Sequence, residues 1–200
     1  MITRLLIATT NTGKQAEMFD LFKSQPYDLI TPQSLGLDLH INETGFTYQE
    51  NAEIKAAAFY KASGFPSLSD DSGLEVDALN GAPGLHSARF SPDPEAKDSD
   101  RRRLLLEGLN AHQRPWAARF VCCVVLAVSP HERIVATGQC RGEIIPEERG
   151  TNGFGYDPIF LFSSMGKTMA ELTMNEKNAV SHRALAVREL ISKIHTIDQI

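Results

Sequence analysis

Short apolar runs alternate with helical patterns along this chain, and the alternation constrains the possible folds more than any other feature. Residues 5–8 form an apolar run of strand length, and residues 9–13 are polar and rich in turn formers. A helical pattern follows as far as Pro26, and residues 27–30 again have the character of a strand. This order predicts an α/β chain.

The next segment continues the alternation. Residues 47–63 are rich in alanine at helical spacing and predict a helix that Gly64 ends. A strand is expected at 67–69, where it enters an acidic turn at 70–73. Residues 74–79 then alternate as a strand does when one of its faces is solvated.

The second half of the chain predicts one helix and three strands. Residues 94–109 have the pattern of a polar helix, and we expect its leucines at 104–106 to face inward. Two long strands are expected at 116–129 and 133–145, joined as a hairpin, and a short strand at 159–162.

The C-terminal segment predicts a helix that completes the fold. Apolar residues recur at spacings of four and three from Val180 to Ile194, so we expect one amphipathic helix with Lys177 and Ser181 on a shared face near its start. The elements together predict an α/β protein with a mixed central sheet flanked by helices. At 200 residues, a single domain covering residues 1–200 is expected.

Charge and cysteine content exclude several classes of function. The 20 basic and 25 acidic side chains give a net charge of −5, which argues against a protein that coats nucleic acid polymers or binds a membrane. Cys122, Cys123 and Cys140 lack zinc spacing and are expected to be buried thiols. The first ten residues carry too little apolar sequence for a secretory signal, so the expected location is the cytoplasm.

The polar segment after the first predicted strand has the composition of an anion site. It consists of Thr9, Thr10, Asn11, Thr12, Gly13 and Lys14. Backbone amides at a helix start, short hydroxyls and one lysine would together hold a phosphate group. An ordinary capped helix start is the alternative, since Thr and Asn are common N-caps.

Two acidic clusters suggest a bound cation. Glu43 stands before a predicted helix, and Asp70 and Asp71 are adjacent at the end of a predicted strand. Neighbouring carboxylates repel each other, and a cation relieves this. Mg²⁺ suits such oxygen ligands, because it usually takes one or two carboxylates together with substrate phosphates. A solvated loop acid and a plain acidic turn are the alternatives.

A fourth cluster combines an aromatic side chain with several basic ones. Phe154 lies in the glycine-rich segment 150–158, and Lys177, His182 and Arg183 lie near the start of the last predicted helix. Cations there oppose the helix dipole, which favours a ligand over a purely stabilising role, although a solvated basic face is the alternative. All four clusters together predict a site for a triphosphate with Mg²⁺ at one end and a base at the other.

In their order and spacing, these motifs resemble the inosine triphosphate pyrophosphatase family over residues 5–194. The resemblance rests on segments 8–14, 43–45, 50–52 with Lys55, 69–74, 81–84, 87–89, 153–158 and 170–173, and on Lys177 with 181–183. It implies an elongated α/β fold with two lobes and an active-site cleft between them, and a homodimer. It also implies Mg²⁺-dependent hydrolysis of dITP, ITP and XTP to the monophosphate and pyrophosphate.

The resemblance assigns roles by position. Asp71 would be the general base and, with Glu43, a Mg²⁺ ligand, while Phe154 would stack on the base. Donors such as Lys177 or His182 would favour a 6-oxo purine over adenine. The implied substrate-binding residues are Thr9, Thr10, Asn11, Thr12, Gly13, Lys14, Lys55, Ser72, Phe154, Gly155, Tyr156, Asp157, Lys177, His182 and Arg183.

Two alternative functions remain open from the sequence. One is a related nucleotide pyrophosphatase with another base preference, and the other is a nucleotide-binding module without turnover. An assay of pyrophosphate release from a panel of nucleoside triphosphates distinguishes these two functions from the one that the resemblance implies.

Overall fold

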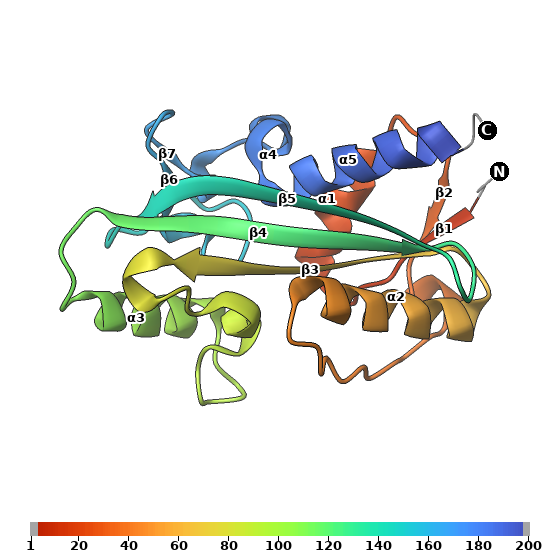
Figure 1. The fold of residues 1–200 in the computed structure, drawn as a ribbon. Coiled ribbons are helices and arrows are strands. Elements are labelled where there is room, and N and C mark those ends of the chain that lie inside the picture. The colour runs from red at the N-terminus through yellow and green to blue at the C-terminus, as the bar shows by residue number, and fades with distance from the viewer. Residues whose placement is uncertain (1–3, 198–200) are drawn as a thin grey trace. The chain divides into compact units, whose positions relative to one another are not determined.

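A seven-stranded mixed sheet with flanking helices forms the fold, in a computed structural model that describes residues 4–197 (Figure 1). The strand order is β2-β1-β3-β4-β5-β6-β7. Strand β1 runs parallel to β2 and β3, whereas β6 is antiparallel to β5 and β7. The predicted α/β class is therefore confirmed.

The elements follow the predicted order. The strands are β1 (Arg4–Ile7), β2 (Asp28–Ile30), β3 (Ser67–Val76), β4 (Trp116–Ala127), β5 (Arg133–Ile144), β6 (Phe160–Phe162) and β7 (Lys167–Thr168). The helices are α1 (Thr12–Phe22), α2 (Tyr48–Ser63), α3 (Asp98–Leu109), α4 (Met174–Val180) and α5 (His182–Ile197). Within residues 4–197, no helix has the length and apolar character needed to cross a membrane.

The chain divides into two compact units, and the long strands β3, β4 and β5 contribute to both. Unit 1 comprises Met1–Asp71, Cys122–Gly138 and His182–Ile200, as far as the structure describes them. Unit 2 comprises Ser72–Val121 and Gln139–Ser181.

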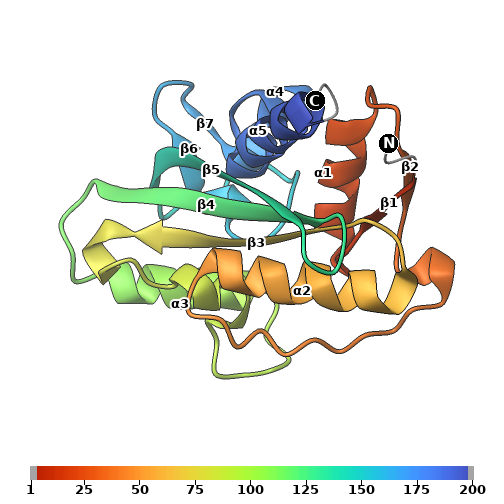
Figure 2. The ribbon, with the colours of Figure 1, turned by 45° about the vertical axis from the view of Figure 1, so that its right-hand side comes forward.

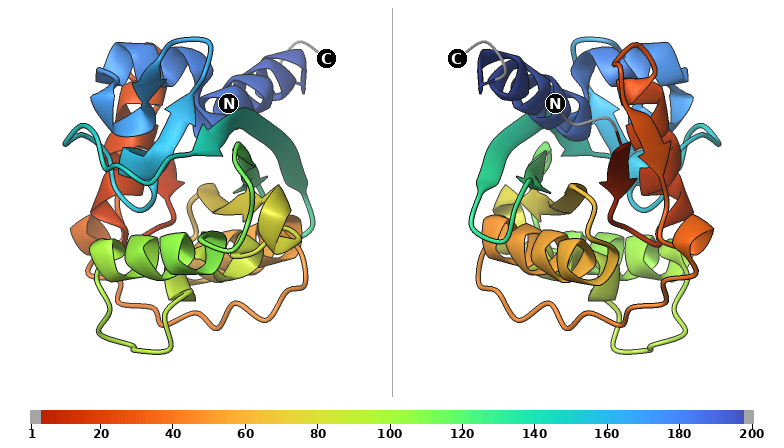
Figure 3. Two further views of the ribbon diagram at one scale, coloured as in Figure 1. Left: turned by 90° about the vertical axis from the view of Figure 1, so that its left-hand side faces the viewer. Right: turned by 90° about the vertical axis from the view of Figure 1, so that its right-hand side faces the viewer.

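In unit 1, strand β4 is buried on both of its faces. Cys123, Val125 and Ala127 pack with Ala52 and Ala56 of α2. The alternate positions Cys122, Val124 and Leu126 pack with side chains of α1 and α5, including Met18, Phe22, Ala186 and Val187. Helix α2 therefore covers one face of the strands and α1 and α5 the other, as Figures 2 and 3 show. Because successive side chains of a strand point to opposite faces, alternate residues of β4 pack against the two helical layers.

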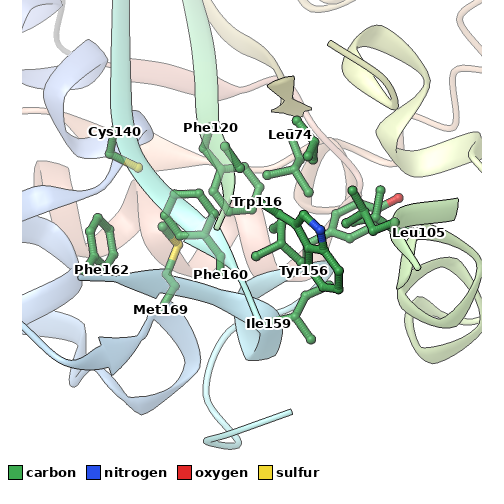
Figure 4. Packing of buried hydrophobic residues seen from close by; sticks show 14 of the residues in the cluster. Leu74, Leu105, Trp116, Phe120, Cys140, Tyr156, Ile159, Phe160, Phe162 and Met169 are labelled. Atoms are coloured by element: carbon green, nitrogen blue, oxygen red, sulfur yellow. The ribbon is translucent and has the colours of Figure 1, made fainter. Parts of the chain in front are cut away.

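In unit 2, several aromatic side chains pack together in the core (Figure 4). The ring centroids of Phe120 and Phe160 lie 4.7 Å apart, and those of Phe160 and Phe162 lie 5.3 Å apart with nearly perpendicular planes. Trp116 and Tyr156 join the same cluster, in which Leu105 of α3 is completely buried. Such tilted and edge-on contacts add to the burial of the ring surfaces.

Helix α2 confirms the prediction for residues 47–63 almost to the residue. The Thr47 hydroxyl accepts a hydrogen bond from the Glu50 amide, and the Glu50 carboxylate accepts one from the Thr47 amide, which completes a capping box. Gly64 ends the helix with a φ of 73°, in the left-handed region that glycine adopts without strain.

The predicted acidic turn at 70–73 is wrong, because β3 runs without a break from Ser67 to Val76. The strand also ends three residues before the predicted limit at 79. Within the predicted range, burial alternates as expected from Leu74 to Val76, whereas residues 67–71 are buried without a break. Unpaired carboxylates favour solvent-exposed turns, because burying an unpaired charge is costly. Asp70 and Asp71 can lie in a buried strand because cationic side chains pair with them.

The prediction of a single C-terminal helix is also wrong, because the helix is interrupted at Ser181. Ser181 has φ −73° and ψ 152°, which is extended backbone, and it separates α4 from α5. A capping box of Thr173 and Glu176 begins α4, so Lys177 and Val180 belong to that short helix. The regular apolar spacing across residues 180–194 concealed the break.

Helix α3 begins at Asp98 rather than at 94, and its leucines do not all face inward. Leu105 is completely buried, whereas Leu104 and Leu106 are only partly buried. Successive helical residues differ by about 100° in direction, so three in a row cannot share one face.

This difference predicts unequal effects of truncation at neighbouring positions. Leu105→Ala should lower the free energy of unfolding by about 2–5 kcal/mol, because it leaves a cavity in the core of unit 2. Leu104→Ala, the matched control, should cost clearly less. Urea denaturation of both variants measures the difference, and equal losses would contradict the packing described here.

Candidate active site

In unit 1, two carboxylates converge on one ammonium group. The Nζ atom of Lys55 in α2 lies 2.9 Å from Oε1 of Glu43 and 3.4 Å from Oδ1 of Asp71. Glu43 comes from the loop before α2, and Asp71 comes from β3. Three segments of the chain thus bring their charges to one point, as expected of a site rather than of separate surface groups.

Asn51 holds these segments together. Its Nδ2 donates to Oδ2 of Asp71 at 3.2 Å, and its Oδ1 accepts from the Gly45 amide at 2.8 Å. Gly45 permits this approach, because a Cβ there would lie 2.6 Å from Cβ of Glu50. Asn51 precedes Lys55 by four residues, so the two side chains share one face of α2.

The charges at this point perturb each other's pKa values. Burial raises the pKa of Asp71, and the positive charge of Lys55 opposes that rise. Burial alone would lower the pKa of Lys55, but the negative charges of Asp71, Asp70 and Glu43 outweigh it and raise that pKa. Lys55 therefore keeps its charge, and Asp71 becomes a better proton acceptor than an ordinary aspartate.

The donor set here fits a small divalent cation. Glu43 and Asp71 already share one positive charge, that of Lys55. Among the residues that the structure describes, no three His, Cys, Asp or Glu side chains form a closed metal cage. Two carboxylates with positions left for substrate oxygens match the preference of Mg²⁺, not that of a structural zinc.

Asp70 is buried in a separate ion cluster. Its Oδ2 lies 3.0 Å from Nζ of Lys14 and 3.0 Å from Nη2 of Arg183. Arg183 also pairs with Glu17 of α1 and is only 1% exposed. Burial would raise the pKa of Asp70, but the charges of Lys14 and Arg183 hold that pKa far below its usual range. Asp70 stays ionised and binds Lys14 in a defined position.

The predicted anion segment lies at the start of α1. Asn11 is the N-cap, and its Oδ1 accepts from the Lys14 amide at 2.9 Å. The Thr9 hydroxyl accepts from the Asn11 amide at 3.2 Å. Thr10 and Thr12 are exposed, and Gly13 is in the first turn of the helix. The capped helix start and the phosphate cradle are therefore compatible, since the cap leaves exposed hydroxyls beside Lys14.

In unit 2, Phe154 lies beside a buried ion pair. Oδ2 of Asp157 accepts from Nζ of Lys177 at 2.7 Å and from the Phe154 amide at 3.0 Å. The Lys177 ammonium lies 5.4 Å from the centroid of the Phe154 ring. The adjacent Tyr156 is buried, and its hydroxyl donates to the Ser87 carbonyl at 2.9 Å. The hydrogen bond from the Phe154 amide to Asp157 and the bond from Tyr156 to Ser87 hold the loop on both sides of Gly155.

The structure brings the predicted site residues together in two groups, one in each unit. The first contains Glu43, Lys55 and Asp71, with Lys14 paired to Asp70. The second contains Phe154, Asp157 and Lys177. Ser72 lies on β3 in unit 2, and His182 begins α5 and is buried.

Sequence reasoning overlooked two contributors in unit 1. Asn51 lies in the motif segment 50–52 and Glu17 in the first predicted helix, and the sequence pattern assigns a role to neither. Glu17 follows Lys14 by three residues, so the two share a helix face, and that spacing was a usable signal. The partners that tie them into the site, Asp71 for Asn51 and Arg183 for Glu17, are remote in sequence.

Comparison with known proteins places the chain in a family. Residues 5–193 match the Ham1 family. The chain belongs to that family. A dITP/XTP pyrophosphatase of Haemophilus ducreyi is 45% identical over 188 residues, which cover 92% of this chain and 95% of that protein. For Haemophilus influenzae, a protein of the same name is 42% identical, with 97% of this chain and 100% of that protein covered.

A solved structure agrees. A HAM1 protein from Coxiella burnetii superimposes with a TM-score of 0.87 at 39% identity, covering 98% of this chain and 100% of that one. The family resemblance drawn from the motifs is confirmed.

The buried ion cluster predicts a specific loss of stability. Asp70→Asn should lower the free energy of unfolding by about 3–5 kcal/mol, because it leaves Arg183 and Lys14 with less negative charge in a buried place. Asp28→Asn, the matched control, breaks the exposed pair of Asp28 with Arg4 and should cost less than about 1 kcal/mol. Urea denaturation near pH 7 compares them, and similar losses would contradict the assignment.

The same cluster predicts a dependence on pH. The pKa of Asp70 is lower in the folded protein than in the unfolded chain, so its contribution is complete above the ordinary aspartate pKa. The contribution is lost as the pH falls below that value toward the folded-state pKa. The difference between the unfolding midpoints of wild type and Asp70→Asn should therefore shrink steadily as the pH falls from about 4 to about 2. A constant difference over that range would be evidence against the depressed pKa.

Proposed function

We propose that this protein hydrolyses the non-standard purine nucleotides dITP, ITP and XTP to the monophosphate and pyrophosphate. The observation that carries this proposal is the convergence of Glu43 and Asp71 on Lys55, in a chain whose close relatives are named dITP/XTP pyrophosphatase. We propose further that residues 1–200 act as one pyrophosphatase domain, as a cytoplasmic homodimer, with Mg²⁺ as cofactor.

In the proposed reaction, a water oxygen bonds to the α-phosphorus, and the bond from that phosphorus to the bridging oxygen breaks. Pyrophosphate leaves with the electron pair of the broken bond, and Asp71 accepts the proton of the water. The pKa of Asp71, raised by burial, improves its fit to this role. Lys14 and Lys55 place two positive charges where the leaving group gains negative charge.

Glu43 and Asp71 would hold the divalent cation. When bound, Mg²⁺ would offset charge on the phosphate oxygens and lower the pKa of water. Lys55 pairs with both carboxylates, and its flexible side chain would let it turn toward the phosphate oxygens of a bound nucleotide.

At the base end, Phe154 supplies an aromatic face, and the nearby Lys177 supplies a cation that donates hydrogen bonds. A donor at this point favours the 6-oxo group of hypoxanthine or xanthine over the 6-amino group of adenine. The other residues that the resemblance assigns to the substrate remain predictions: Thr9, Thr10, Asn11, Thr12, Gly13, Ser72, Gly155, Tyr156, Asp157, His182 and Arg183.

A substrate panel tests the proposal. Wild type with Mg²⁺ should release pyrophosphate, and not orthophosphate, from ITP, dITP and XTP. It should act on ATP at least about 100-fold more slowly, the scale of rejection by mispaired donors. Equal rates on ATP and ITP would refute the base preference. Binding of ITP without any release of pyrophosphate would support the non-catalytic alternative.

Asp71→Asn tests the base assignment in the same assay. It should lose at least about 100-fold in kcat, the scale of a general base, while its unfolding midpoint shows a folded protein. Asp28→Asn, which alters a surface pair, is the control and should keep wild-type turnover. Wild-type turnover by Asp71→Asn would remove Asp71 from the reaction.

The position of Lys55 predicts an effect on metal affinity without nucleotide. Lys55→Met removes the charge that Glu43 and Asp71 now share, so Mn²⁺, used as a spectroscopic substitute, should bind the nucleotide-free variant at least several-fold more tightly than wild type. Electron paramagnetic resonance titration of free Mn²⁺ measures this. Unchanged or weaker binding would show that these carboxylates are not the metal ligands.

A further inference from the structure

The loop that carries Phe154 is fastened to helix α3 through both polar groups of one residue. Oδ2 of Asp98, the first residue of α3, accepts from the Gly155 amide at 2.7 Å. Nη1 of Arg102, one turn later, donates to the Gly155 carbonyl at 2.7 Å. A contact at either group alone would let the loop pivot, whereas the two contacts hold the two peptide units that flank the Cα of Gly155.

Both members of this α3 clamp (Asp98 and Arg102) are themselves held. Arg102 makes two parallel bonds to Glu148, each 2.8 Å long, and Asp98 also pairs with Arg101. The paired bonds leave the Arg102 guanidinium little freedom to rotate. Gly155 has a φ of 60°, so it turns the chain sharply in a region that favours glycine, and a Cβ there would meet no atom within 4 Å. Glycine is needed for conformation, not for space.

The clamp acts on the residue next to Phe154. The Asp157 carboxylate accepts a hydrogen bond from the Phe154 amide, and the clamp holds the peptide units on both sides of Gly155. The backbone before and after Phe154 is therefore positioned. Asp98 and Arg102 lie more than fifty residues before Gly155 in the chain, and neither occurs in the motifs that carry the family resemblance.

We propose that Asp98 and Arg102 are positioning residues for purine binding, which act by holding the Phe154 ring in place through Gly155. This inference rests on the proposed function, in which Phe154 stacks on the base. Neither residue touches the phosphates or the reacting atoms in that proposal. The clamp therefore contributes to uniform binding of substrate and transition state, which changes KM more than kcat.

Arg102→Gln and Asp98→Ala test the clamp, with Arg103→Gln as the matched control. Arg103 is on the same helix but exposed, and it pairs with Glu107. Each clamp variant should raise KM for ITP about 3- to 10-fold, the size expected from the loss of one hydrogen bond, and should keep kcat within about 2-fold. Inhibition by inorganic triphosphate, which has no base, should be unchanged. The control should match wild type throughout.

A double-variant comparison separates positioning from a general structural effect. In a Phe154→Ala background, Arg102→Gln should cause no further rise in KM, because the ring that the clamp positions is gone. The same rise in both backgrounds, or weaker inhibition by inorganic triphosphate, would overturn the proposal.

Two outcomes distinguish failure of the clamp from failure of the proposed function. If Phe154→Ala raises KM and neither clamp variant does, the clamp is refuted and the base assignment stands. If Phe154→Ala leaves KM for ITP unchanged, the stacking role in the proposed function is refuted, and the clamp proposal with it. Thermal unfolding followed by circular dichroism verifies that each variant is folded.

Discussion

The buried carboxylate of Asp70 is the constraint on which the rest of unit 1 depends. A charge removed from water costs several kcal/mol unless partners of opposite charge surround it. Lys14 of α1 and Arg183 of α5 supply that charge, and Glu17 balances Arg183 in turn. The requirement ties two helices and one strand together, because the buried groups Asp70, Glu17 and Arg183 pair with one another, and Asp70 also pairs with Lys14.

Strand geometry then separates the roles of two adjacent acids. Successive side chains of β3 point to opposite faces, so Asp70 meets α1 and α5 while Asp71 meets Asn51 and Lys55 of α2. Their pKa values move in opposite directions, downward for Asp70 and upward for Asp71. One carboxylate is kept ionised to position Lys14, and its neighbour is left able to accept a proton. The family resemblance assigned no role to Asp70, and the strand supplies one.

The two units place their functional groups by different means. In unit 1 the cluster around Lys55 and Asp71 is held by ion pairs between regular elements. In unit 2 the loop around Phe154 has no regular structure of its own, and it is held by hydrogen bonds from α3 and by the pair of Asp157 with Lys177. A loop fastened in this way can present an aromatic face without the cost of ordering that face on each binding event.

The sequence by itself determined the α/β class, the bounds of α2 and the clusters of chemically active residues. Those features are local: a capping box, a left-handed glycine and runs of polar residues can be recognised from neighbouring positions. Tertiary structure alone decided that residues 70–73 belong to a strand, that the last helix breaks at Ser181, and that Arg183 is buried against Asp70 and Glu17. The buried positions of Asp70 and Arg183 depend on charge pairing with residues distant in the chain, and such partners leave no trace in local spacing. The same reason explains why the bonds from Asp98 and Arg102 to Gly155 became visible only in the folded protein.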